Sequence, residues 1–237
     1  MQRIRPFINT DLIKVFTGIR RAGKSVMLEL VKNELKESGI GEENFLCINF
    51  EQFSNSQFLD VESLYKKITD FQKNTKGKIY LFFDEIQEVD GWEKCINSCR
   101  IDFDCDIYIT GSNAKLLSGE LATYLAGRYV EFVIYPFSFA EFFEMNLIKN
   151  PNADKATCFM QFLKTGGMPF LSNFPDDDAA KSQYLIDIYN SVVLKDVVKR
   201  NNIRDVDTLE RIVAYAFSNI GHIFSATSLS KYFKSEN

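Results

Sequence analysis

The eight residues 18–25, which read Gly-Ile-Arg-Arg-Ala-Gly-Lys-Ser, constrain the fold more than any other part of the sequence. They match the phosphate-binding pattern G-x-x-x-x-G-K-[ST] at every fixed position. An apolar run precedes them and an amphipathic stretch follows, as expected for a loop between a strand and a helix. Glycines let successive backbone N–H groups point at phosphate oxygens, and the helix N-terminus adds partial positive charge. The segment predicts a nucleotide-binding loop in an α/β fold.

Several positions of this phosphate loop (residues 18–25) have an expected role. Lys24 would reach the β- and γ-phosphates, and the Ser25 hydroxyl would ligate Mg²⁺. Arg20 and Arg21 form either a solvated basic tip or a contact with the nucleotide or a neighbouring domain. The predicted nucleotide-binding residues are Gly18, Ile19, Arg20, Arg21, Ala22, Gly23, Lys24, Ser25 and Val26.

The first 137 residues alternate short apolar runs with amphipathic stretches, a pattern typical of a parallel sheet covered by helices. We expect strands at 13–17, 45–50, 79–83, 106–110 and 129–135. We expect helices at 24–37, 61–73, 92–100 and 114–125. The fold class is therefore α/β, a P-loop NTPase with a five-stranded parallel sheet.

Two carboxylates, Asp84 and Glu85, end the predicted strand 79–83. Asp84 would hold Mg²⁺ through its water shell, and Glu85 would polarise the attacking water as a general base. A full strand, 45–50, separates this strand from the loop strand in sequence. Together with the phosphate loop, this acidic pair predicts Mg²⁺-dependent ATP hydrolysis.

Three further polar residues are candidates for the reaction. Ser112 or Asn113, after strand 106–110, would sense the γ-phosphate, or else cap the helix that begins at 114. Arg128, before the last strand, would stabilise transition-state charge, or is a surface arginine beside a turn glycine. If Arg128 acts on another subunit's nucleotide, the active form is a homo-oligomer.

The pattern changes after Pro136. We expect a short helix at 138–145, a turn-rich break at 150–154, and helices at 156–164, 179–199 and 207–219. We interpret the chain as an ATPase core at 1–149, a helical lid at 150–210 and the start of a winged helix at 211–237.

Composition and charge exclude several classes of protein. The net charge of −4 disfavours broad non-specific nucleic-acid binding, and the single histidine gives little support to Ser-His-Asp catalysis. No apolar run is long enough for a transmembrane helix, and the N-terminus lacks the apolar core of a signal peptide. We expect a cytoplasmic protein without membrane contact, whose five scattered cysteines are reduced thiols.

The phosphate loop, the segment Phe83-Asp84-Glu85-Ile86-Gln87, Gly127-Arg128 and Pro136-Phe137-Ser138-Phe139 together resemble the AAA-type archaeal/bacterial ATPase family of the AAA+ and STAND group. The resemblance implies an ATPase core of the additional-strand, catalytic-glutamate type, with a helical lid and an arginine finger at a place like that of Arg128. Members commonly carry a winged helix and a nuclease-like domain of unknown function. The segment Gly166-Gly167-Met168-Pro169 resembles the Gly-x-Pro element of STAND lids, in which the proline packs near adenine; a simple helix-breaking turn is the alternative.

Residues 224–233 resemble the start of the helix-turn-helix in that winged helix, and the sequence stops at Asn237, about where a recognition helix should begin. We therefore expect most of the winged helix to be missing. The favoured function is an Mg²⁺-dependent ATPase that binds ATP and ADP and works as a nucleotide-controlled switch. The alternative is a DNA-associated module controlled by ATP through that missing region. A small-molecule kinase is disfavoured because no arginine-rich lid is evident, and a GTPase because no Asn-Lys-x-Asp segment occurs.

Overall fold

The structure is a computed structural model that describes residues 1–111, 125–174, 177–192, 197–198, 203–223 and 225–235. The described residues form two compact units, Met1–Ser182 and Gln183–Asn237. The first unit holds the sheet and the chain that follows it as far as Ser182. The predicted domain boundaries at 149 and 210 stay a prediction.

The sheet has five parallel strands in the order β2-β3-β4-β1-β5. Strands β1 and β3 are buried completely and β4 is buried except at its first residue, which explains why their sequences are apolar with little alternation. The sheet and all its strands confirm the predicted fold class. The strands are β1 (Ile13–Thr17), β2 (Phe45–Asn49), β3 (Ile79–Asp84), β4 (Cys105–Thr110) and β5 (Tyr129–Val133).

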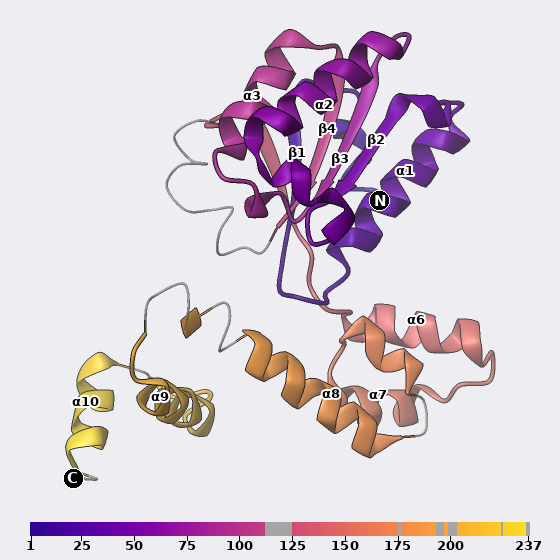
Figure 1. The fold of residues 1–237 in the computed structure, drawn as a ribbon. Helices are drawn as coiled ribbons and strands as arrows, with labels where there is room; N and C mark the ends of the chain where they lie inside the picture. Colours follow the sequence, from indigo (N-terminus) through magenta and orange to yellow (C-terminus); the bar gives the residue numbers. More distant parts are fainter. Residues whose placement is uncertain (112–124, 175–176, 193–196, 199–202, 224, 236–237) are drawn as a thin grey trace. The chain divides into compact units, whose positions relative to one another are not determined.

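Helices cover both faces of this sheet (Figure 1). Helix α1 (Lys24–Glu37) buries Leu28, Val31 and Leu35 on one face, in a cluster with Phe16 and Phe82. Helices α2 (Val61–Asn74) and α3 (Trp92–Asp102) pack against the other face, where alternate strand residues point. This two-sided burial places the ends of the strands, rather than their faces, next to solvent.

The carboxyl ends of parallel strands meet at one edge of the sheet, where ligands bind in open α/β folds. The phosphate loop follows β1 at this edge, and Asp84 ends β3 there. Strand β5 ends at Val133 rather than at the predicted residue 135. Pro136, which lacks an N–H, follows closely and cannot donate to a strand ladder.

The helices after β5 begin with strong caps. Ser138 and Glu141 form a reciprocal capping box for α6 (Phe139–Lys149), and Asp154 caps α7 (Lys155–Thr165). Helices α8 (Asp178–Ser191), α9 (Val206–Ser218) and α10 (Ala226–Ser235) follow. Helix α10 falls on the segment predicted to start a helix-turn-helix, whose DNA-related role stays a prediction. Short 3-10 helices are η1 (Arg5–Phe7), η2 (Glu42–Asn44), η3 (Phe53–Leu59), η4 (Ile86–Glu88) and η5 (Pro169–Asn173).

The predicted helix 114–125 falls almost wholly outside the described residues, and α8 covers only the first part of the predicted 179–199. Within the described part of the chain, no helix combines the length and apolarity needed to cross a membrane.

Candidate nucleotide-binding site

The phosphate loop turns sharply between β1 and α1. Gly18 and Gly23 have φ angles of +144° and +106°, a region that favours glycine. A Cβ atom on Gly18 would lie 2.1 Å from the carbonyl oxygen of Ile134, just beyond β5. Gly18 is therefore required both by its backbone angle and by this close approach. Arg21 also has a positive φ, +67°, which is uncommon for a residue with a side chain.

Lys24 lies at the base of the loop as a buried cation. Its side chain is only 5% exposed, and its Nζ lies 3.4 Å from Glu85 Oε1. The same Nζ lies 3.3 Å from the Gly18 carbonyl oxygen and 3.4 Å from that of Ile19. All three distances exceed the 2.7–3.2 Å of an ordinary N–H···O hydrogen bond. A buried ammonium whose contacts with the described residues are all this long is well suited to take a closer anionic partner.

Asp84 is oriented by two neighbours that the sequence analysis did not select. The hydroxyl of Thr110 donates to Asp84 Oδ1 at 2.5 Å, and the amide of Asn49 donates to Oδ2 at 2.9 Å. Asn49 ends β2 and Thr110 ends β4, so both belong to the same edge of the sheet as Asp84. Polar residues at strand ends were the signal that could have identified them.

Ser25, Asn49 and Asp84 line a common pocket of about 370 Å³ beside the N-terminus of α1. Hydroxyl and carboxylate oxygens are ligands that suit Mg²⁺, which usually keeps several waters and takes few protein ligands. The side chains present therefore fit an Mg²⁺ ion between Ser25 and Asp84. Val26, which is 60% exposed, lines the same pocket.

Glu85 is buried and has a left-handed φ of +56°. Its backbone N–H donates to the Thr110 hydroxyl at 2.9 Å. One carboxylate oxygen faces Lys24, and the other accepts a 2.5 Å hydrogen bond from Gln87 Nε2. The structure thus brings Glu85 to the phosphate loop and adds Gln87, a residue that no sequence argument selected.

The remaining loop residues differ in environment. Ala22 is buried, Ile19 is 46% exposed, and Arg20 forms an ion pair with Glu51 at 3.5 Å. Arg21 is exposed. The ion pair of Arg20 adds a third possibility to its two predicted roles.

Arg128 lies at the amino end of β5, whereas the phosphate loop follows the carboxyl end of β1. It immediately precedes β5, where Tyr129 pairs with Ile13 and Val133 pairs with Thr17. The five residues of β1 span about 16 Å, more than an arginine side chain can bridge. Its guanidinium donates to Asn97 Oδ1 of α3 at 3.0 Å. Arg128 therefore does not reach the loop of its own chain.

Two predicted sensors, Ser112 and Asn113, lie outside the described residues. Pro169 begins η5, two residues after Gly167, whose carbonyl oxygen accepts a 2.8 Å hydrogen bond from the Phe137 amide. Phe137 is three residues beyond Ile134, which contacts Gly18. This short path connects Pro169 with the edge of the sheet that carries the phosphate loop.

Comparison with known protein families shows the family to which the chain belongs. The profile described as "AAA domain" matches residues 10–143, more than half of the chain, including the loop and the acidic pair. The chain belongs to the AAA-type family of P-loop ATPases. This confirms the resemblance drawn from its motifs. A second profile, a domain of unknown function (DUF8612), matches residues 157–236 of this AAA-type protein.

Two relatives match the whole AAA-type chain or nearly so. An "Uncharacterized protein" of Haemophilus influenzae is 39% identical over 236 residues, covering 100% of this chain and 58% of the relative. "Uncharacterized protein MJ1544" of Methanocaldococcus jannaschii is 34% identical over 240 residues, covering 94% of this chain and 51% of the relative. The chain thus spans between half and three fifths of the length of these curated relatives.

The AMPPCP-bound structure of DnaA from Aquifex aeolicus is similar in fold. It shares 16% sequence identity and a TM-score of 0.50, over 94% of this chain and 68% of the DnaA chain. At this identity the likeness shows the fold, an AAA-type α/β architecture.

Proposed function

We propose that this protein binds ATP at residues 18–25 and hydrolyses it with the help of Mg²⁺. The observation that carries the proposal is Lys24, a buried cation at the base of a glycine-rich loop with no contact shorter than 3.3 Å among its hydrogen bonds and ion pairs within the described residues. The AMPPCP bound to the DnaA of similar fold supports a nucleoside triphosphate as the ligand.

The chain's own residues have complementary roles in this reaction. Loop amides and Lys24 would hold the phosphates, and Ser25 and Asp84 would hold an Mg²⁺ ion, which when bound would supply positive charge to the phosphate oxygens. Glu85 accepts a proton from the attacking water. Lys24 contacts both the Glu85 carboxylate and the carbonyl oxygen of Gly18 in the loop, so a phosphate bound by the loop would compete with Glu85 for Lys24. The base would then be released for water, and this coupling supports a nucleotide-controlled switch.

The test is ATP hydrolysis by wild type and Glu85→Gln. We expect turnover to fall on the order of 10²–10⁴-fold while ATP affinity changes little, because the amide cannot accept the proton. Glu62→Gln, which removes an exposed carboxylate at the start of α2, serves as the matched control and should keep wild-type turnover. If the Glu85→Gln variant binds ATP and hydrolyses it as fast as wild type, Glu85 is not the general base.

About 16 Å of strand separates Arg128 from the loop of its own chain, which supports action on the nucleotide of a neighbouring subunit. We therefore propose that the active form is a homo-oligomer. Arg128→Ala and Glu85→Gln should each be nearly inactive alone, and mixing them should restore part of the turnover. In the mixture, Glu85→Gln subunits supply Arg128 to neighbours that keep Glu85. Light scattering with and without ATP checks the oligomer directly, and a mixture that stays inactive would contradict action between subunits.

Pro169 is proposed to pack near the adenine. The hydrogen bond between Gly167 and Phe137 and the contact between Ile134 and Gly18 support this placement. A Pro169→Ala variant should weaken ATP binding while leaving binding of inorganic triphosphate, which has no base, unchanged.

A further inference from the structure

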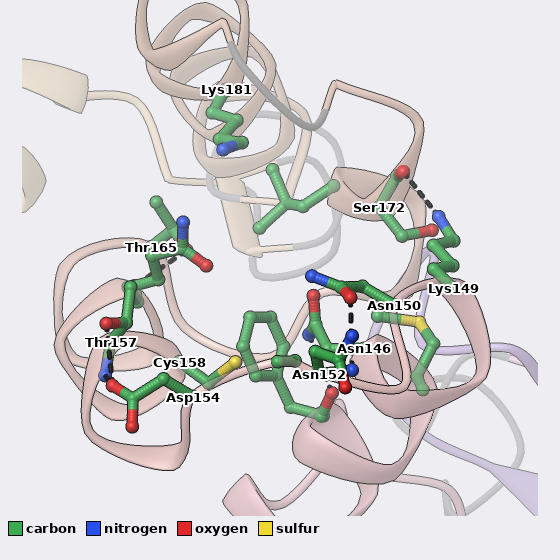
Figure 2. Close-up of a pocket in the computed structure, with 15 residues that line it drawn as sticks. Asn146, Lys149, Asn150, Asn152, Asp154, Thr157, Cys158, Thr165, Ser172 and Lys181 are labelled. Carbon is green, nitrogen blue, oxygen red and sulfur yellow. Dashed lines mark hydrogen bonds between the residues drawn. The ribbon is translucent and has the colours of Figure 1, made fainter.

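A second pocket, separate from the candidate nucleotide site, lies among α6, α7, η5 and α8 (Figure 2). Its volume is about 400 Å³, within the range of small-molecule sites. Cys158 and Leu171, which are buried, supply part of an apolar wall. Amide side chains of Asn146 and Gln161 add hydrogen-bond donors and acceptors. Most of the residues that line the pocket are polar, with an apolar wall on part of its surface, so the lining suits a polar small molecule.

The charged residues of this pocket favour an anion. They are Lys149, Lys181 and Asp154. Asp154 is already engaged as the N-cap of α7, where its Oδ2 accepts bonds of 2.8 Å and 2.7 Å from the Thr157 amide and hydroxyl. These hydrogen bonds lower the pKa of Asp154, and its negative charge lies at the positive end of the helix. The two lysines therefore set the charge offered to a ligand.

Lys181 is a buried cation in this helical part of the first unit. Its Nζ lies 3.7 Å from Asp178 Oδ1, and the same carboxylate is bound at 2.5 Å by Lys164. One acidic group is thus shared by two ammonium groups. Figure 2 shows the Lys181 side chain extending from α8 toward the pocket, with Asn146 and Asn150 bordering another side.

Lys149 is directed at the same pocket from the end of α6. Its Nζ donates to the backbone carbonyl of Ser172 at 2.7 Å. The acceptor in this bond is a neutral carbonyl, so a carboxylate or phosphate oxygen would add the attraction between opposite charges. Lys149 thus gains a charged partner from such a ligand, and Lys181 adds a second positive charge to the lining of the same pocket.

We propose that this pocket binds a small organic anion, with Lys181 and Lys149 contacting its carboxylate or phosphate group. The site is independent of the phosphate loop and of the ATPase activity proposed above. A carboxylate and a phosphate both offer negatively charged oxygen atoms as hydrogen-bond acceptors. The experiment distinguishes them by using citrate and inorganic phosphate as separate probes.

The test is a titration of the full chain with each probe at constant ionic strength, followed residue by residue through backbone amide NMR signals. We expect saturable shifts among residues 142–181 with at least one probe, and about a tenfold weaker affinity for Lys181→Gln, the loss of one charge-assisted contact. Lys149→Gln, a change at an exposed position, should also weaken binding and gives a second variant if Lys181→Gln does not fold.

Lys155→Gln is the matched control, because Lys155 belongs to α7 and does not line the pocket. It should bind both probes as wild type does. Shifts that do not saturate, that are equal in Lys155→Gln and Lys181→Gln, or that are confined to residues 18–25 would overturn the proposal. The last outcome would leave the nucleotide site untouched, since the two sites give separate signals.

Discussion

At the residue scale, Glu85 is held at its backbone and at both of its carboxylate oxygens. Its left-handed φ of +56° costs on the order of 1–3 kcal/mol for a residue with a side chain, and such strain persists only where neighbours impose it. Thr110 binds its N–H, while Lys24 and Gln87 hold its carboxylate. Of the two groups that hold the carboxylate, Gln87 would keep its contact with Glu85 if Lys24 turned to a phosphate.

Gln87 is therefore expected to position Glu85 during hydrolysis. Gln87→Leu should lower kcat about tenfold and change KM little, because the phosphate loop is intact and only the direction of the base is lost. Gln87 Oε1 is buried without a hydrogen-bond partner among the described residues, so the leucine should not unfold the protein. Steady-state kinetics check the split between kcat and KM.

Gln57→Leu, at an exposed position in η3, makes the same chemical change away from the site and should leave both constants unchanged. An unchanged kcat in Gln87→Leu, in a wild type that hydrolyses ATP, would remove the positioning role while leaving Glu85 as the base.

At the scale of elements, the segment that leaves β5 connects the sheet with the helices beyond it. Its Ile134 approaches Gly18, and its Phe137 approaches Gly167 so closely that a Cβ there would lie 2.0 Å from the Phe137 carbonyl oxygen. The Phe137 amide in turn donates to the Gly167 carbonyl oxygen at 2.8 Å. Two glycines thus permit the backbone contacts that join the loop, β5 and η5.

Gly167→Ala should break this junction. The added methyl group forces the backbones apart, at a cost of roughly 1–3 kcal/mol, and the Phe137 hydrogen bond should open. Hydrogen exchange followed by NMR measures this as faster exchange of the Phe137 amide. Gly166→Ala is the comparison, since a Cβ there meets no atom within 4 Å, although its φ of +71° adds local strain. Equal exchange rates in the two variants would refute a steric junction at Gly167.

At the scale of the whole molecule, a buried ion pair ties the amino ends of the strands to the N-terminal segment. Lys14 of β1 and Asp106 of β4 are paired, and both side chains are fully buried. Asp106 also accepts 2.7 Å bonds from the Asn9 amide and the Tyr108 hydroxyl. Burial lowers the pKa of Lys14, and Asp106 opposes that shift. Burial and the nearby Asp106 raise the pKa of Tyr108, so its hydroxyl stays protonated and donates.

Lys14→Met should therefore destabilise the protein strongly, because it leaves the buried carboxylate of Asp106 without its cation. We expect a loss of about 3–5 kcal/mol in the free energy of unfolding, and partial recovery when Asp106→Asn is added. Urea unfolding, followed by the fluorescence of the buried Trp92, measures this in the first unit. Lys78→Met, which removes the half-buried partner of the exposed Asp104, should cost about 0–1 kcal/mol. Similar losses in Lys14→Met and Lys78→Met would contradict this account.

The strands, the phosphate loop and the acidic pair could be predicted from the amino-acid sequence alone. These features depend on neighbours in the chain: apolar runs mark buried strands, and glycines with lysine and serine at fixed spacing mark a loop before a helix. The end of α1 at Glu37, followed by Gly39 at φ +97°, was likewise predictable from the Ser38-Gly39 pair.

The contacts between residues far apart in the sequence became known from the three-dimensional structure alone. The sheet order places Asn49 and Thr110 on either side of Asp84, although neither has a distinctive sequence context. The same order puts Arg128 at the opposite edge from Lys24, and it pairs Lys14 with Asp106 across 92 positions of sequence. Such contacts depend on which strands pair and in which direction they run. The hydrophobic pattern along each segment of the sequence does not specify this pairing. Eight residues of sequence were enough to identify the phosphate loop. The residues that surround its site, such as Asn49 and Thr110, depend on how the five strands are arranged.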